Sequence, residues 1–242
     1  MTELIVVNSH SHLNVRVSPQ PTPESVEMNA VSVVPREFPR LLAHYPLFFL
    51  KSQESGRFEP VALLGFEPKE NLFFVNGRWD VEYLPLQIQR QPFSLVPRSA
   101  TAVAPASLDL AIDMSSAQIR TDDGERLFTE DGRATKYLED RASMLQALVT
   151  GSKEAYDFTG RLTELGLLES VQIKVEFVDR SEKQLQGLYW IAAAALEKLT
   201  AAQLMGMRDR KYLEWMYFQI ASLSHVSALV ARKNRLISGV TR

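Results

Sequence analysis

The sequence predicts an α+β fold in which a β-rich N-terminal half precedes a helical half. Apolar and polar residues alternate strictly over residues 171–177, as in a strand with one buried face. Asn76-Gly77 follows an apolar run and is a strong local signal for a β-hairpin, because both residues tolerate positive φ. Apolar residues recur at helical spacing over residues 213–227, which predicts a long final helix.

The first half is expected to form mixed or antiparallel sheets with short helices. Its apolar runs are short and bounded by Pro, Gly and Asn, which is typical of strands. Pro35 suits the first turn of a short helix that Pro46 ends, and Pro85–Gln91 predicts a helical turn. The expected strands cover residues 4–7, 12–17, 47–50, 61–64, 71–75, 79–83, 93–96 and 108–113, and Thr101–Ala106 is a small-residue linker.

The second half becomes helical near Asp131. Helical spacing predicts two helices, over residues 137–148 and 155–165, before a β-hairpin of residues 171–177 and 188–191. Thr200 with Gln203 forms a capping box at the start of a further helix. We expect a β-rich half over residues 1–125 and a helical half over residues 126–242, joined as one integrated domain.

Composition excludes several classes of protein. Lys and Arg total 27 against 29 Asp and Glu, so nucleic acid is not an expected partner. The absence of cysteine excludes disulfides, thiolate metal sites and cysteine nucleophiles. The N-terminus lacks the features of a signal peptide, and no apolar run approaches the ~20 residues of a membrane span. We expect a cytoplasmic protein with no transmembrane segment, and export by a signal-independent route stays open.

No standard catalytic motif is present, neither a Gly-rich phosphate loop nor a Gly-x-Ser-x-Gly elbow. In a strand, His10 and His12 would share one face and could begin a metal site. Asp109 and Asp113 would also share a face, as a carboxylate pair for acid–base chemistry does. Structural histidines and the solvent side of a strand are the simpler interpretations. We therefore expect no catalytic residue, metal or cofactor, and favour a non-enzymatic protein without settling the question.

The C-terminal segment is rich in positive charge and in aromatic residues. A basic helix either binds acidic partners or is a solvated helix whose late cations suit its dipole. Aromatic residues on more than one side indicate a helix that is deeply packed or contacts another chain. The C-terminal helix is therefore the expected surface for a homo-oligomer. The cations are Arg208, Arg210, Lys211, Arg232, Lys233, Arg235 and Arg242.

A series of short segments carries a family resemblance. They are Asn29-Ala-Val, Glu37-Phe-Pro39, Tyr45-Pro46, Pro60-Val-Ala-Leu-Leu-Gly65, Asn71-Leu-Phe73, Gly77-Arg-Trp79, Tyr83 with Pro85, Pro92-Phe93, Leu162-x-x-Leu-Gly-Leu-Leu168 and Leu185-x-Gly-Leu-Tyr189. In order and length they resemble the SapC family of bacterial proteins. The family is named for a surface-layer gene cluster and is distinct from a peptide-transporter permease of the same name. The resemblance implies an accessory or binding role in envelope-linked uptake or modification.

The candidate site residues are polar residues of these segments, together with Arg90 just before Pro92-Phe93. Their simpler roles are helix-end contacts, an Asx turn and surface ion pairs. Their functional role would be to line a pocket in which an arginine fork holds a carboxylate, or to contact a partner. The candidates are Glu37, Asn71, Arg78, Tyr83 and Arg90.

Three hypotheses for function follow. The leading one is a non-enzymatic accessory or binding protein that acts by protein–protein contact. The second is an enzyme, or the substrate-binding partner of a modifying enzyme, with a small polar pocket near Glu37, Asn71 and Arg90. The third is a structural component of a surface layer.

Overall fold

The computed structural model describes residues 3–98 and 108–239, so the predicted linker Thr101–Ala106 and Arg242 lie outside the described residues. The chain divides into two compact units. Unit 1 comprises Met1–Ser25 and Leu86–Thr150, and unit 2 comprises Val26–Pro85 and Gly151–Arg242. The predicted division into residues 1–125 and 126–242 stays a prediction. Helices and antiparallel sheets in both units confirm the α+β fold.

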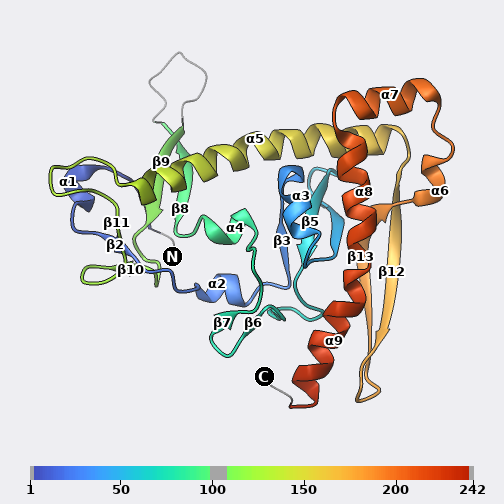
Figure 1. The fold of residues 1–242 in the computed structure, drawn as a ribbon, viewed down its shortest axis with the longest axis horizontal. Helices are drawn as coiled ribbons and strands as arrows, with labels where there is room; N and C mark the ends of the chain where they lie inside the picture. Colours follow the sequence, from blue (N-terminus) through green and yellow to red (C-terminus); the bar gives the residue numbers. More distant parts are fainter. Residues whose placement is uncertain (1–2, 99–107, 240–242) are drawn as a thin grey trace. The chain divides into compact units, whose positions relative to one another are not determined.

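Unit 1 contains two small antiparallel sheets, ordered β1-β9-β8 and β10-β2-β11 (Figure 1). Phe93 and Ile112 are fully buried between strands and the first half of helix α5. The elements are β1 (Leu4–Val6), α1 (Ser9–His12), β2 (Arg16–Val17), α2 (Pro23–Val26), α4 (Leu86–Gln89), β8 (Phe93–Pro97), β9 (Leu108–Asp113), β10 (Ile119–Arg120), β11 (Glu125–Arg126) and α5 (Lys136–Glu164).

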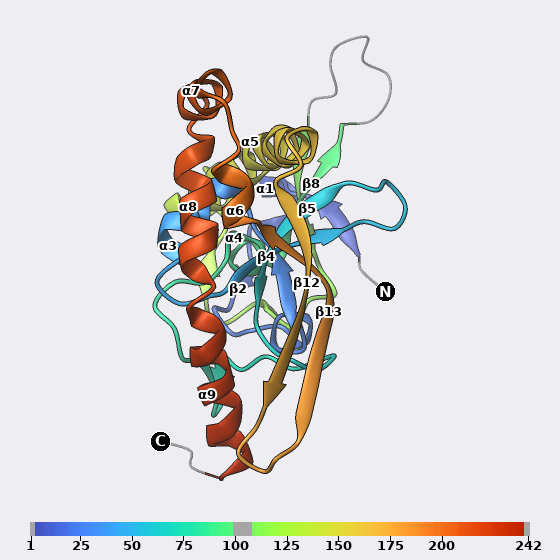
Figure 2. The ribbon, with the colours of Figure 1, turned by 90° about the vertical axis from the view of Figure 1, so that its right-hand side faces the viewer.

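Unit 2 is organised on a five-stranded antiparallel sheet of order β12-β13-β4-β5-β3. A short hairpin, β6-β7, and the C-terminal helices complete the unit (Figures 1 and 2). Its elements are β3 (Ala30–Ser32), η1 (Pro35–Glu37), α3 (Phe38–Leu41), β4 (Leu47–Lys51), β5 (Phe58–Leu63), β6 (Phe74–Val75), β7 (Arg78–Trp79), β12 (Leu168–Glu176), β13 (Glu182–Ile191), α6 (Ala193–Leu196), α7 (Ala201–Asp209), α8 (Tyr212–Ser222) and α9 (His225–Ile237).

Two buried polar side chains join α8 to the sheet of unit 2. The Ser222 hydroxyl accepts a hydrogen bond from the Leu47 amide at 2.9 Å. The Gln219 side chain donates to the Leu47 carbonyl at 2.8 Å and accepts from the Ile191 amide at 3.1 Å. Both side chains are 0% exposed. They satisfy backbone groups at a strand start and a strand end that water cannot reach.

Aromatic packing adds the second half of α5 to the same core. The fully buried Phe158 lies 5.2 Å from the ring of Tyr212 and 5.4 Å from that of Trp215 on α8. On its other side the Phe49 ring of β4 lies 6.3 Å away. Unit 2 therefore layers its sheet, α5 and α8 around Phe158.

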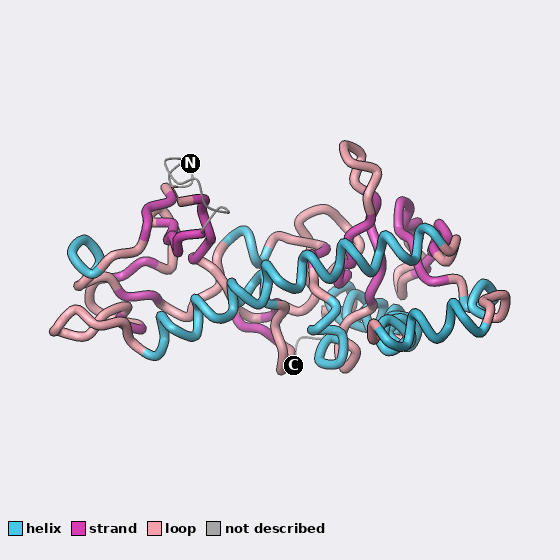
Figure 3. Tube along the Cα trace, turned by 90° about the horizontal axis from the view of Figure 1, so that it is seen from above, coloured by secondary structure: helices cyan, strands magenta, loops and turns pink. Residues whose placement is uncertain are grey.

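Helix α5 corrects the expectation of two helices. It runs unbroken from Lys136 to Glu164 (Figure 3). Gly151, a poor helix former, lies inside it. A Cβ added at this glycine would lie 2.7 Å from the Val34 Cβ, so the absence of a side chain allows Val34 to pack against the helix. Tertiary packing thus overrides the local preference for a break.

Three strand predictions, for residues 12–17, 71–75 and 79–83, are also wrong in extent. His10 and His12 lie on the short helix α1, where the Asn8 side chain caps the first turn by accepting from the Ser11 amide. They therefore do not share the face of a strand. The predicted strands at residues 71–75 and 79–83 shrink to the two-residue strands β6 and β7. Their Asn76-Gly77 turn has positive φ at both residues, as the hairpin signal predicts.

The long final helix is present but bent between α8 and α9. At the bend, the Leu223 and Ser224 amides bond to carbonyls three residues back, which tightens the turn. Two basic residues beyond the bend form ion pairs within unit 2. Arg232 pairs with Asp80 at 2.6 Å, and Lys233 pairs with Glu70. These two cations therefore stabilise the fold. Among the described helices, none is long and apolar enough to cross a membrane.

Two glycines of α5 give a matched test of its packing. We expect Gly151→Ala to lower the free energy of unfolding by about 1–3 kcal/mol, because the new methyl overlaps Val34. Gly160→Ala meets nothing within 4 Å and should raise that free energy by about 0.5–1 kcal/mol through helix propensity. Urea unfolding measures both. Equal effects of the two substitutions would contradict the close contact at Gly151.

Candidate functional site

Glu37 ends the turn η1 and is only 3% exposed. Its Oε2 accepts from the Val34 amide at 3.1 Å, which closes the first turn of the helix. Its Oε1 accepts from the Tyr83 hydroxyl, also at 3.1 Å. The buried carboxylate therefore joins the start of this helix to the segment after β7.

Tyr83 belongs to the same polar cluster in unit 2. Its carbonyl accepts from the Tyr45 hydroxyl at 2.8 Å, and the Arg40 guanidinium lies 5.3 Å from its ring centroid. Burial and the neighbouring Glu37 carboxylate raise the pKa of the Tyr83 phenol. Burial is also the main cause that raises the pKa of Tyr45. Both phenols therefore stay protonated and serve as hydrogen-bond donors.

Asn71 forms the Asx turn that its type and position predict. Its Oδ1 accepts from the Phe73 amide at 3.0 Å. The preceding loop is close-packed, because a Cβ on Gly65 would lie 2.2 Å from the Glu70 carbonyl oxygen. Glu70 Oε2 in turn accepts from the Phe66 amide at 2.8 Å. Asn71 thus shapes the backbone of this loop.

Arg78 and Arg90 differ from Glu37 and Asn71 in that neither arginine is buried. Arg78 is exposed on β7, directly after the Asn76-Gly77 turn. Arg90 is half-buried in unit 1, where it follows α4, whereas the other four candidates belong to unit 2. Glu37 and Tyr83 are the candidates that a hydrogen bond joins. The role of all five in binding a ligand or partner stays a prediction.

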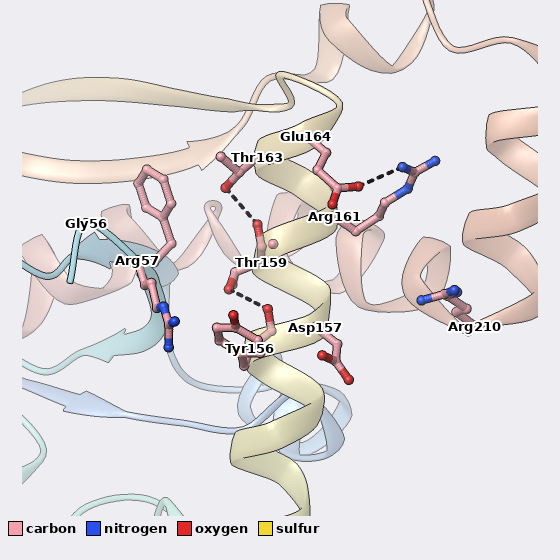
Figure 4. A pocket seen from close by; sticks show the side chains of 11 residues that line it. Gly56, Arg57, Tyr156, Asp157, Thr159, Arg161, Thr163, Glu164 and Arg210 are labelled. Atoms are coloured by element: carbon pink, nitrogen blue, oxygen red, sulfur yellow. Dashed lines mark hydrogen bonds and ion pairs between the residues drawn. The ribbon is translucent and has the colours of Figure 1, made fainter.

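A groove in unit 2 gathers side chains of which the sequence pointed only to Arg210, as a C-terminal cation. It encloses about 380 Å³ beside the second half of α5. Figure 4 shows Arg57, from the turn before β5, on one side of the helix, and Arg161, Glu164 and Arg210 toward the other. These residues come from three separate stretches of the chain, so no local sequence motif predicts the groove.

The most exposed aromatic residue of the groove is Tyr156, at 49%. The Arg57 guanidinium carbon lies 4.5 Å from its ring centroid, which is a cation–π contact. Phe58, next along β5, packs edge-on against Tyr189 with centroids 4.8 Å apart. The Tyr156–Arg57 pair therefore lies on a packed part of the sheet.

The groove carries both signs of charge. Arg161 pairs with Glu164 at 2.8 Å, while Asp157 and Arg210 also line it. Its threonine hydroxyls are occupied by helix carbonyls, since Thr163 donates to the Thr159 carbonyl at 2.8 Å. Among the described residues that line the groove there is no histidine to activate a nucleophile. The arrangement presents charged and aromatic groups that can bind a polar and aromatic surface.

Comparison with known proteins decides the family. The SapC family model matches residues 7–229 of the chain. The chain belongs to the SapC family. The resemblance seen in the segments from Asn29 to Tyr189 is thereby confirmed. Searches of curated proteins and of solved structures returned no match. The family match includes both the Glu37–Tyr83 pair and the whole groove.

The raised phenol pKa values of this SapC-family chain predict its response to alkaline pH. A tyrosine whose folded pKa lies above its ordinary value of 10.0 adds stability that is present below pH 10.0 and is lost as pH rises toward the folded pKa. The free energy of unfolding should therefore fall above that pH. In Tyr83→Phe this fall should be shallower, and stability at pH 7 should drop by about 1–3 kcal/mol through loss of the bond to Glu37.

Unfolding in urea at a series of pH values measures this prediction. Tyr217→Phe removes an exposed hydroxyl on α8 and is the matched control, with a curve that follows the unmodified chain. A Tyr83→Phe curve that coincides with the control at every pH would refute a buried Tyr83–Glu37 bond.

Proposed function

We propose that this SapC-family chain is a non-enzymatic accessory protein that acts by binding another protein through the groove beside α5. The observation that carries the proposal is the exposed Tyr156 ring stacked by Arg57. Tyrosine and arginine are the residue types most enriched among those that dominate binding energy at protein interfaces. A half-exposed tyrosine contributes a large apolar area that a partner removes from water.

Preorganisation supports the same proposal. Arg57 precedes β5, whose pairing with β4 is continuous over five residue pairs. Tyr156 follows the buried Ala155 and precedes the buried Phe158 on α5. The helix holds the backbone of Tyr156, and the cation–π contact already brings Arg57 onto its ring, so ordering this pair on binding costs less.

The charges around the tyrosine define the partner's chemistry. An apolar side chain would cover Tyr156, and separate carboxylates would face Arg57 on one side of the helix and Arg210 toward the other. The Asp157 carboxylate favours a partner cation at the same rim. The setting that we propose is a surface-layer system or a receptor-associated system of uptake or modification, which the family resemblance implies.

The alternative of an enzyme pocket near Glu37, Asn71 and Arg90 has less support. The Glu37 carboxylate already receives the Val34 amide and the Tyr83 hydroxyl, and the Asn71 side chain receives the Phe73 amide. Groups committed in this way stabilise the backbone. Binding through the groove leaves the hydrogen bonds of Glu37 and Asn71 in place.

Site-specific photo-crosslinking in native cells tests the binding surface. A photoreactive phenylalanine analogue at position 156 should yield a discrete adduct with one partner protein under ultraviolet light. Arg57→Ser in the same chain should lower the adduct yield at least tenfold, because it removes the cation over the ring. The partner is then identified by mass spectrometry and its affinity measured with purified proteins.

The same analogue at position 217 is the matched control. Tyr217 is 60% exposed on α8 and does not line the groove. An adduct of twice the chain mass from position 217 would support the proposed homo-oligomer through the C-terminal helix. No adduct from position 156, or the same partner with equal yield from both positions, would contradict the groove as the binding surface.

A further inference from the structure

Unit 1 has a separate pocket of about 550 Å³, within the range of small-molecule sites. Its polar lining includes Thr22, Arg90, Ser94, Asp113 and Ser116. Leu4, Pro23 and Pro92 add apolar wall. All of these residues belong to unit 1, so the pocket is independent of the groove in unit 2.

The Arg90 side chain is fixed by neutral acceptors. Its Nε donates to Gln87 Oε1 at 2.6 Å. Its Nη1 donates to the Phe93 carbonyl at 2.8 Å and to Ser94 Oγ at 3.0 Å. The Nη2 amino group is not used by any of these bonds. The guanidinium is therefore oriented, and it retains donors for a further acceptor.

The charge of this half-buried guanidinium is not balanced by a carboxylate. Across residues 3–98 and 108–239, no ion pair involves Arg90. Burial lowers the pKa of Arg90, with no opposing effect from an acidic neighbour. Buried charges in proteins are normally paired, because removing an ion from water is costly. An anion in the pocket would supply the missing partner.

Two serine hydroxyls of the pocket lining can each donate a hydrogen bond to the anion. Ser94 Oγ accepts from Arg90, and Ser116 Oγ accepts from the Gln118 amide at 3.2 Å. A serine that accepts one hydrogen bond still has its hydroxyl hydrogen to donate. Thr22 differs, because its hydroxyl already donates to Gln91 Oε1 at 2.8 Å. Ser94 and Ser116 are thus the hydroxyl donors suited to an anion.

The two acidic residues of the lining limit the charge of the ligand. Asp113 Oδ1 accepts from the Glu3 amide, the Ser115 amide and the Ser115 hydroxyl at 3.0, 3.0 and 2.6 Å, so donors from the protein already surround it. Glu24 is exposed and solvated. Together they would repel a phosphate dianion more than a carboxylate monoanion.

We propose that Arg90 binds the carboxylate group of a small organic acid in this pocket, with Ser94 and Ser116 as additional donors and the apolar wall against the rest of the ligand. The Nη2 amino group, which none of the three bonds of Arg90 uses, can donate to a carboxylate oxygen, and the guanidinium charge attracts the anion. The pocket would give the protein a small-molecule ligand in addition to its proposed protein partner.

Nuclear magnetic resonance titration of the ¹⁵N-labelled full-length chain tests the proposal. The probes are acetate, propionate and benzoate, each compared with its neutral amide. We expect the carboxylates to shift the Arg90 Nε–H signal and the amides of Ser94 and Ser116 with saturation, and the neutral amides to leave them unmoved. Arg90→Gln should weaken binding at least tenfold, and Ser116→Ala should weaken it about threefold.

Arg133→Gln is the matched control, because Arg133 is an exposed arginine of unit 1 that pairs with Asp131 outside the pocket. It should bind as the unmodified chain does. If Arg90→Gln fails to fold, the Ser116→Ala variant and the Arg90, Ser94 and Ser116 signals of the unmodified chain still test the proposal. Absence of saturable shifts, equal weakening by Arg133→Gln, or inorganic phosphate binding more tightly than every carboxylate would overturn the proposal. Photo-crosslinking at position 156 is a separate readout, so either proposal can fail alone.

Discussion

The hydrogen bonds from α8 to the ends of β4 and β13 are the contacts on which the arrangement of unit 2 depends. Gln219 and Ser222 satisfy the backbone of Leu47 and Ile191 where neither strand partners nor water do so. Leaving such groups unpaired in the interior costs about 1–3 kcal/mol each. Helix α8 therefore cannot rotate or shift along its axis without leaving a buried polar group unsatisfied.

The positions of the other layers follow from this constraint. With α8 fixed, Tyr212 and Trp215 present their rings to Phe158 and so hold the second half of α5. The outer side of that half-helix then carries Tyr156 beside Arg57. The proposed binding surface thus depends on the buried polar contacts that fix α8. The family segments around Glu37 and Asn71 serve the same scaffold, since their polar atoms satisfy backbone amides.

Local signals in the sequence predicted the local parts of this structure. The Thr200–Gln203 capping box and the Asn76-Gly77 turn form as expected, because neighbouring residues determine them. The predicted hairpin also forms, but its second strand runs over Glu182–Ile191 instead of residues 188–191. Gln219 and Ser222 are polar, so the spacing of apolar residues in the final helix did not identify them as buried. It predicted instead that the residues of the apolar stripe face the core. The burial of Gln219 and Ser222 depends on strand ends more than 25 residues away. The groove and the Arg90 pocket depend equally on long-range placement, although Arg90 itself stands out as a polar residue among core-forming segments.

Native-state hydrogen exchange at two amides tests the central constraint most directly. Because their hydrogen bonds are buried, the Leu47 and Ile191 amides should exchange only on global unfolding, at the rate of the slowest core amides. Gln219→Met should then accelerate exchange at Ile191, whose acceptor is lost, more than at Leu47, whose acceptor is Ser222. Ser222→Ala should show the reverse order. Fast exchange at both amides in the unmodified chain, or variants that affect both amides alike, would contradict the account.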